Sequence, residues 1–247
     1  MARRRTIFVS IVATLVAVGV LSACTGSGRV AVKPLAPVTT TTPPKPVEYR
    51  QVAWAAVPNV QVFQQPGAPA PAGVLKNPTA EKQPLAFLAI AKESDWLQVR
   101  LPSRPNSAVG WVKAADVKLG DVPAYRILVE VGARRLTLFK GEEVVMQEPV
   151  GVGKGRTPTP TGNFYIDAMV RLSNPNTVWG PFQMSVSGFS NVLDRFMGGP
   201  GQIAIHGTNT PQLIPGDISN GCVRMKNEAI TKLADLTGIG TPVDIVA

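Results

Sequence analysis

The chain of 247 residues is 45% hydrophobic, with 23 Pro and 23 Gly, so it is long enough for one large or two modest domains and favours short strands and turns over long helices. The chain has two cysteines and one histidine, which almost exclude a structural zinc site with four Cys/His ligands and fully exclude a catalytic zinc site with three histidines. We therefore predict no metal and no cofactor. The net charge of +9 suits attraction to an anionic surface, whereas no Lys/Arg run with interleaved aromatic residues supports nucleic acid as a partner.

The first 23 residues predict a signal peptide. Three arginines, Arg3 to Arg5, precede an apolar run from Ile7 to Leu21 that is shorter than the roughly 20 residues of a membrane-spanning helix. The end of this segment, Leu-Ser-Ala-Cys, resembles a bacterial lipobox, which implies cleavage before Cys24 and lipidation of its thiol. The alternatives are ordinary secretion with a free Cys24 and an uncleaved anchor. With a lipid on Cys24 the protein is tethered to the outer face of the membrane, and Cys222 has no disulfide partner within the chain.

Residues 24–49 are predicted to be a linker. Their Pro/Thr-rich composition, which includes "PVTTTTPPKPV", cannot bury a core and favours extended polyproline-like conformers. At about 3.1 Å per residue such a segment reaches roughly 70 Å, so it can hold a domain away from the membrane.

Residues 50–119 predict a small β-barrel domain. In "DWLQVRLP" the residues Leu97, Val99 and Leu101 alternate with Trp96, Gln98 and Arg100, as expected for a strand with one buried face. This run and the later "GWV" resemble bacterial SH3-like domains. The resemblance implies that the domain can bind cell-wall polymers, whereas the structural alternative makes the two tryptophans core residues.

Residues 124–247, which follow the boundary at "DVP", predict a second and mainly β domain. "YRILVEV", "RRLTLF" and "VVMQEPVGV" are separated by turn residues and predict an antiparallel meander. "GVGKG" lacks the remaining residues of a phosphate-binding loop, and no helix pattern follows it. Apolar residues at helical spacing predict one short helix over 227–236, with Asn227 as its N-cap and Gly238 after its end, and "TPVDIVA" predicts a last strand.

The candidate chemistry lies in two glycine-flanked segments, "IHGT" and "SNGCVRM". They contain the only histidine, His206, and Cys222, which is 16 residues later. An imidazole that takes the proton of a thiol produces a reactive thiolate. In an extended segment Cys222 and Arg224 share one face while Val223 faces the core. The amides of Gly221 and Cys222 are then placed to donate to an oxyanion.

Each of these residues has a plain structural alternative. A lone cysteine is most often a small buried hydrophobic residue, and a lone histidine is often a satisfied structural residue. Their combination with adjacent glycines and Arg224, in Gly/Pro-rich segments, favours a catalytic interpretation over two independent structural ones.

These two segments resemble the active-site signature of L,D-transpeptidases with a YkuD-type catalytic domain. The resemblance covers roughly residues 125–247 and includes "TPTPTGNFYI". It implies a β-sandwich with the active cysteine in a cleft under a flap. It also implies that Cys222 is the nucleophile, that His206 is the general base, and that the backbone carbonyl of Gly207 orients the imidazole.

The resemblance further implies that Ser219, Asn220, Gly221 and Arg224 shape the substrate site. Asn220 departs from the family pattern, in which many members have a second histidine, so His206 is expected to act alone. The implied substrates are peptidoglycan stem peptides. Cys222 attacks the carbonyl after the third residue of a tetrapeptide donor, D-alanine leaves, and an amine acceptor on another stem gives a 3→3 cross-link.

The sequence leaves the acceptor open. Water as acceptor makes the protein an L,D-carboxypeptidase, and a protein amine makes it an attachment enzyme. A non-catalytic wall-binding lipoprotein is a further alternative. In papain-like enzymes the cysteine precedes the histidine, and sortases have wider spacings, so neither family fits. The expected location is the cell envelope outside the cytoplasm, and the oligomeric state is not predicted.

Overall fold

The protein is described from a computed structural model, which covers residues 50–80 and 82–247. The predicted signal peptide (1–23), the lipidation site Cys24 and the linker (24–49) lie outside the described residues. No helix in the described part of the chain combines the length and the apolarity needed to cross a membrane.

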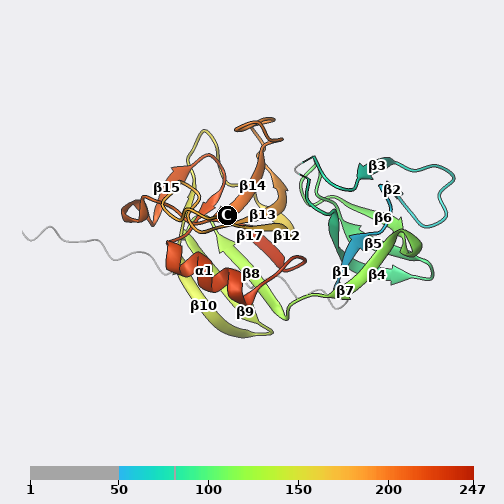
Figure 1. Ribbon diagram of the computed structural model, residues 1–247, viewed down its shortest axis with the longest axis horizontal. Helices are drawn as coiled ribbons and strands as arrows, with labels where there is room; N and C mark the ends of the chain where they lie inside the picture. The colour runs from blue at the N-terminus through green and yellow to red at the C-terminus, as the bar shows by residue number, and fades with distance from the viewer. Residues whose placement is uncertain (1–49, 81) are drawn as a thin grey trace, which may run out of the picture. The chain divides into compact units, whose positions relative to one another are not determined.

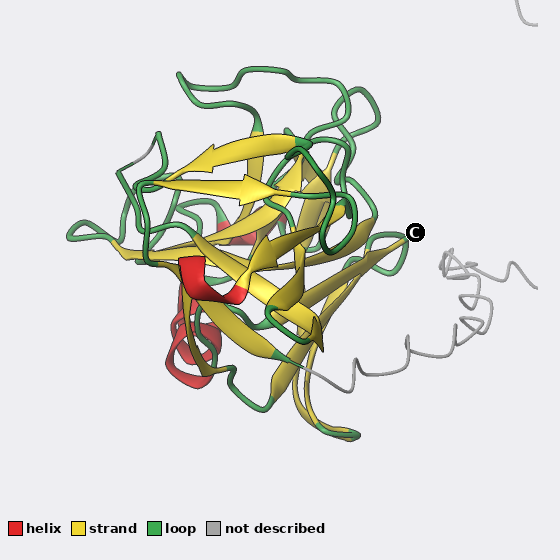
Figure 2. Cartoon of the chain, turned by 90° about the vertical axis from the view of Figure 1, so that its right-hand side faces the viewer, coloured by secondary structure: helices red, strands yellow, loops and turns green. Residues whose placement is uncertain are grey.

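The described chain is mainly β, as predicted, with a single longer helix (Figure 2). The first group of strands forms a five-stranded antiparallel sheet in the order β6-β5-β4-β1-β7 and a separate hairpin of β2 and β3. A 3₁₀ turn at Ala114–Asp116 leads into the last strand of this sheet. The strands are β1 (Gln51–Ala55), β2 (Asn59–Val62), β3 (Gly73–Lys76), β4 (Ala86–Glu93), β5 (Trp96–Arg100), β6 (Val109–Lys113) and β7 (Val117–Asp121).

Strand β5 confirms the predicted alternation. Leu97 and Val99 are fully buried in the core of this part of the protein, whereas Trp96 and Gln98 on the other face remain partly exposed. The edge of the Trp96 ring packs against Phe63, with ring centroids 5.0 Å apart. The period of two in the sequence therefore identified the buried face of this sheet.

The second group of strands forms a ten-stranded sheet in the order β10-β9-β8-β17-β12-β13-β14-β16-β11-β15 (Figure 1). Its strands are β8 (Tyr125–Glu130), β9 (Arg135–Lys140), β10 (Glu143–Pro149), β11 (Gly151–Gly153), β12 (Gly162–Arg171), β13 (Phe182–Phe189), β14 (Gln202–His206), β15 (Gly216–Ser219), β16 (Val223–Arg224) and β17 (Pro242–Val246).

The predicted meander is confirmed, because β8, β9 and β10 pair antiparallel in chain order. The last strand, β17, is inserted centrally: it pairs parallel with β8 and antiparallel with β12. Strand β12 joins two halves of the sheet: residues 162–165 pair with β17 in one half, and residues 166–171 pair with β13 in the other. The register with β13 shifts between Ile166 and Ala168. Because both halves contribute to one core, the expected sandwich is built from a single curled sheet.

Helix α1 (Asn227–Leu236), labelled in Figure 1, has the predicted bounds. Its four apolar residues at helical spacing are buried: Ala229, Ile230, Leu233 and Ala234. The predicted N-cap is wrong. Asn227 is the first helical residue, and Lys226 holds the cap position without a side-chain hydrogen bond. The Asn227 side chain instead bonds two segments outside the helix. The sequence identified a polar residue at the helix start but not what it binds.

Hydrogen bonds also link loops of the first sheet to the second sheet. The hydroxyl of the fully buried Tyr165 donates to Ala86 O at 2.9 Å. Asn106 makes a two-point contact with the backbone of Phe189, accepting from its N–H at 2.8 Å and donating to its carbonyl at 2.7 Å. The Asn106 contact anchors the end of β13, which precedes the loop into β14.

Candidate active site

The pairing of β14 with β16 brings His206 and Arg224 to one face of the sheet, and Cys222 directly precedes β16. The two strands run parallel, with Ile205 opposite Val223 and His206 opposite Arg224. Ile205 and Val223 are buried in the core at 0% and 1% exposure. Because side chains alternate along a strand, His206 and Arg224 point to the opposite side. Cys222 lies just before β16, and the charge of Arg224 acts on both His206 and Cys222.

A tight turn presents Cys222. The hydroxyl of the buried Ser219 donates to the carbonyl of Cys222 at 2.6 Å and accepts from the N–H of Gly221 at 3.0 Å. Gly221 has φ +119°, a conformation that other residues rarely adopt. The need for glycine here is conformational, because an added Cβ would meet no atom closer than 3.5 Å.

The same turn corrects one expectation. The N–H of Gly221 was predicted to donate to an oxyanion, but it is already bonded to the Ser219 hydroxyl. An amide in an internal hydrogen bond is a poor donor to a developing charge unless that bond breaks. The Cys222 amide remains the candidate donor of the predicted pair.

His206 is held from two directions. Its Nδ1 lies 2.6 Å from the carbonyl oxygen of Gly207. A carbonyl only accepts, so Nδ1 carries the proton and Nε2 is the lone-pair nitrogen. The ring of Trp179 packs against the imidazole with centroids 4.7 Å apart and planes at 60°. His206 is 2% exposed as a result.

Burial sets the protonation of both residues. The pKa of His206 is lowered from 6.5 to about 4. Burial is the main cause, the bond to Gly207 opposes the shift, and the nearby charge of Arg224 adds to it. Burial likewise raises the pKa of the Cys222 thiol, against the effects of a backbone hydrogen bond from Ala204 and of Arg224. Both shifts favour the neutral forms, which suits an imidazole that takes the thiol proton as the reaction begins.

Arg224 and Asn220 lie on either side of the cysteine turn. The buried Nε of Arg224 has no hydrogen-bond partner among the described residues. The side chain of Asn220 accepts a long hydrogen bond from Thr157 at 3.4 Å, and Thr157 also donates to Ser219 O at 3.3 Å.

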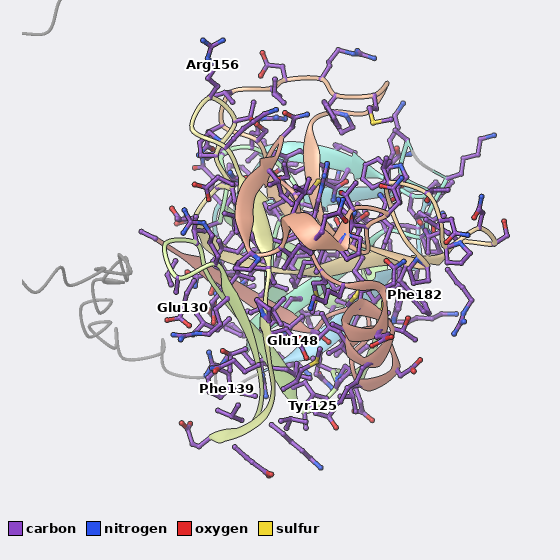
Figure 3. The ribbon with its side chains drawn as sticks, turned by 90° about the vertical axis from the view of Figure 1, so that its left-hand side faces the viewer. Tyr125, Glu130, Phe139, Glu148, Arg156 and Phe182 are labelled. Carbon is purple, nitrogen blue, oxygen red and sulfur yellow. The ribbon has the colours of Figure 1, made fainter. Side chains whose placement is uncertain are left out.

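Thr157 belongs to the loop 154–161, which follows β11. The backbone of Lys154 also donates to Ser219 O at 3.1 Å, so this loop is tied to the cysteine turn at two residues. Arg156 of the same loop points away from the protein (Figure 3). The loop therefore borders the turn with one side and faces solvent with the other.

All of the predicted site residues within the described chain lie in β14, in β16, at the end of β15 or in the adjoining turns. The sequence missed Trp179, Thr157 and the backbone of Ala204, and it misassigned Asn227. Trp179, Thr157 and Asn227 have no short-range pattern that marks them, because each meets the site from another segment of the chain. Ala204 lies in β14 and acts through its backbone, which its residue type does not reveal. Within the described residues no group of three or more His, Cys, Asp or Glu side chains is placed to hold a metal ion.

The sequence of this chain is similar to those of known proteins. A family model described as the YkuD-type L,D-transpeptidase catalytic domain matches residues 124–245. The chain is 33% identical over 150 residues to the family protein YkuD of Bacillus subtilis, covering 59% of this chain and 83% of that protein. It is 28% identical over 159 residues to ErfK/SrfK of Salmonella typhimurium, covering 58% of this chain and 50% of that protein.

Among solved structures, an L,D-transpeptidase from Mycobacterium tuberculosis is 14% identical to this chain and superposes with a TM-score of 0.42. The superposition covers 58% of this chain and 67% of the other.

Proposed function

Since the chain belongs to the L,D-transpeptidase family, we propose that it is a peptidoglycan L,D-transpeptidase with Cys222 as nucleophile and His206 as general base. The observation that supports this proposal is the pairing of β14 with β16, in which His206, the only histidine of the chain, lies opposite Arg224, two residues after Cys222. The carbonyl of Gly207 orients the imidazole, because it accepts from Nδ1 at 2.6 Å.

The first half-reaction is acylation. The neutral Nε2 of His206 takes the thiol proton as the Cys222 sulfur attacks the carbonyl carbon after the third residue of a tetrapeptide stem. The bond from that carbon to the terminal D-alanine nitrogen then breaks. The imidazolium gives its proton to the leaving amine, so a thioester and free D-alanine result, and His206 is neutral again.

The second half-reaction transfers the acyl group. An amine on the third residue of another stem attacks the thioester carbonyl, and His206 removes a proton from that nitrogen. The carbon–sulfur bond breaks and the imidazolium returns its proton to the sulfur, so the thiol and the neutral imidazole are recovered. The product is a 3→3 cross-link. The low pKa of His206 suits this role, because the base must be unprotonated before each half-reaction.

The surrounding residues have supporting roles. Ser219 holds the turn that presents Cys222, and the Cys222 amide is the donor to the oxyanion of the tetrahedral intermediate. Arg224 has an unpaired, buried Nε beside the nucleophile, which suits it to bind a carboxylate or carbonyl group of the donor peptide. Asn220 and Gly221 line the same turn.

We propose that this chemistry takes place at the cell envelope. We propose that 1–23 is a cleaved signal, that Cys24 carries a lipid anchor and that 24–49 is a stalk. The five-stranded sheet with alternately buried residues supports an SH3-like domain over 50–119, with the catalytic domain over 124–247. An envelope location outside the cytoplasm agrees with peptidoglycan as the substrate.

Acylation by a carbapenem tests the nucleophile. Intact mass should show one adduct on the wild type and on Cys24→Ser, and none on Cys222→Ala, although the latter stays folded by circular dichroism. The chain has only these two cysteines, so Cys24→Ser is the matched control. An adduct on Cys222→Ala would show that another residue is the nucleophile.

Incubation with a purified disaccharide tetrapeptide tests the acceptor. A cross-linked dimer and released D-alanine are expected. Hydrolysed tripeptide without dimer would instead make the protein a carboxypeptidase, and transfer only to an added protein amine would make it an attachment enzyme. Neither acylation nor D-alanine release from the wild type would favour a non-catalytic wall-binding protein.

A further inference from the structure

The carbonyl that orients His206 belongs to a peptide unit with a second partner. This unit joins Gly207 to Thr208, and its N–H donates to Oδ1 of Asn227 at 2.8 Å. A peptide unit is planar, with its C=O and N–H pointing in opposite directions. A hydrogen bond at the N–H end therefore limits the rotation of the carbonyl at the other end.

The Asn227 carboxamide is itself fixed by its partners. Its Nδ2 donates to Pro175 O at 3.2 Å, in the loop between β12 and β13. An amide N–H needs an acceptor and a carbonyl needs a donor, so these two bonds determine which end is oxygen and which is nitrogen. The residue stands at the start of α1, whose buried face anchors it to the core.

Two glycines let this side chain approach the backbone. A Cβ on Gly207 would lie 2.5 Å from Asn227 Oδ1, and a Cβ on Gly180 would meet the same atom. Gly180 has φ +63°, and it immediately follows Trp179, whose ring covers His206. The side chain thus lies where the histidine loop and the loop carrying Trp179 meet.

We propose that Asn227 is a positioning residue for His206, acting through the Gly207–Thr208 peptide. It occupies the place that an Asp or Asn has in a catalytic triad, with one peptide unit inserted between it and the imidazole. Hydrogen bonds in series polarise one another, so the bond from Thr208 N–H makes Gly207 O a better acceptor. The result is one tautomer, with Nε2 left to accept the thiol proton. This proposal rests on His206 being the general base.

A purely structural role as a helix cap does not account for these contacts. The cap position belongs to Lys226, and the Asn227 side chain makes both of its hydrogen bonds to segments outside the helix. Its own backbone carbonyl accepts from the hydroxyl of Thr231 at 2.8 Å, which is a separate bond within the helix. Thr231 therefore provides a matched control on the same turn.

Three variants separate positioning from stability. Asn227→Ala removes both hydrogen bonds. Asn227→Asp keeps an oxygen for Thr208 N–H and adds a charge at a helix N-terminus, where the helix dipole favours it. Thr231→Ala removes a bond to the same residue without touching the histidine loop. Asn227→Ala is expected to slow carbapenem acylation by about 10- to 100-fold, as a misplaced catalytic group does. Asn227→Asp should recover most of the rate, and Thr231→Ala should acylate like the wild type.

The single histidine allows a direct readout that does not depend on activity. With ¹⁵N-labelled histidine, the full chain has one imidazole signal to follow by NMR. The wild type should show the Nδ1–H tautomer over the neutral range. Asn227→Ala should show a mixture of tautomers. Asn227→Asp should keep the tautomer and titrate at a higher pH than the wild type, because a nearby carboxylate favours the imidazolium.

The outcomes distinguish this proposal from the proposed function. If the wild type acylates on Cys222, but Asn227→Ala has the wild-type rate and tautomer, the positioning role is wrong and the transpeptidase assignment stands. Equal slowing in Thr231→Ala and Asn227→Ala, with unchanged tautomers in both, would assign the effect to the helix and also overturn the proposal. A wild type that never acylates refutes the proposed function instead.

Discussion

Lowering the pH should inactivate this enzyme only well below the range in which an ordinary histidine titrates. Burial under Trp179 and within β14 lowers the pKa of His206 from 6.5 to about 4. At 1.36 kcal/mol per pKa unit, this corresponds to about 3 kcal/mol in favour of the neutral imidazole. The base is therefore ready to accept a proton across the neutral and mildly acidic range.

The same shift affects stability, with a definite sign. Between about pH 6.5 and pH 4 the unfolded chain binds a proton at His206 that the folded chain does not bind. The free energy of unfolding therefore falls as the pH is lowered through this window, by up to about 3 kcal/mol from this residue. Urea unfolding at several pH values measures the loss, and the variant His206→Gln should lack this contribution.

The assay is the second-order rate of carbapenem acylation as a function of pH. The acid limb of this profile, where the rate falls as the pH is lowered, should have its midpoint near pH 4 in the wild type. Arg224→Gln should move this midpoint to a higher pH, because the Arg224 charge lowers the pKa of His206. Lys226→Gln, which removes a neighbouring exposed charge, should leave the limb in place. An acid limb near 6.5 in the wild type would refute the reasoning, because it would mean that the imidazole is solvated.

Three substitutions test the packing around the site. Gly207→Ala places a Cβ 2.5 Å from Asn227 Oδ1, so carbapenem acylation should slow by about tenfold or more, and a wild-type rate would contradict the crowding. Leu233→Ala, at a fully buried position of α1, should lower the free energy of unfolding in urea by about 2–5 kcal/mol, whereas a loss under 1 kcal/mol would imply a loosely packed helix. Tyr165→Phe removes the hydrogen bond to Ala86 O and should cost about 1–3 kcal/mol in the same assay; no loss would mean that this bond contributes nothing.

Local patterns in the sequence predicted the elements that frame the site. Alternation identified the buried residues of β5, and helical spacing identified α1 with its four buried residues. The pairing of "IHGT" with "SNGCVRM" located Cys222 and His206, since both motifs lie within short, glycine-flanked segments. These features depend on neighbours a few residues apart, so the sequence alone contains them.

Only the tertiary structure decided how the catalytic groups are held. The Ser219 hydroxyl already accepts from the N–H of Gly221. Trp179 and Asn227 reach the histidine loop from other segments, and Asn227 also donates to Pro175 O, 52 residues away along the chain. The direction of a side-chain hydrogen bond depends on which backbone groups the folded sheet leaves without partners. A sequence identifies the residues that can make such bonds, and the packing of distant segments determines which bonds they make.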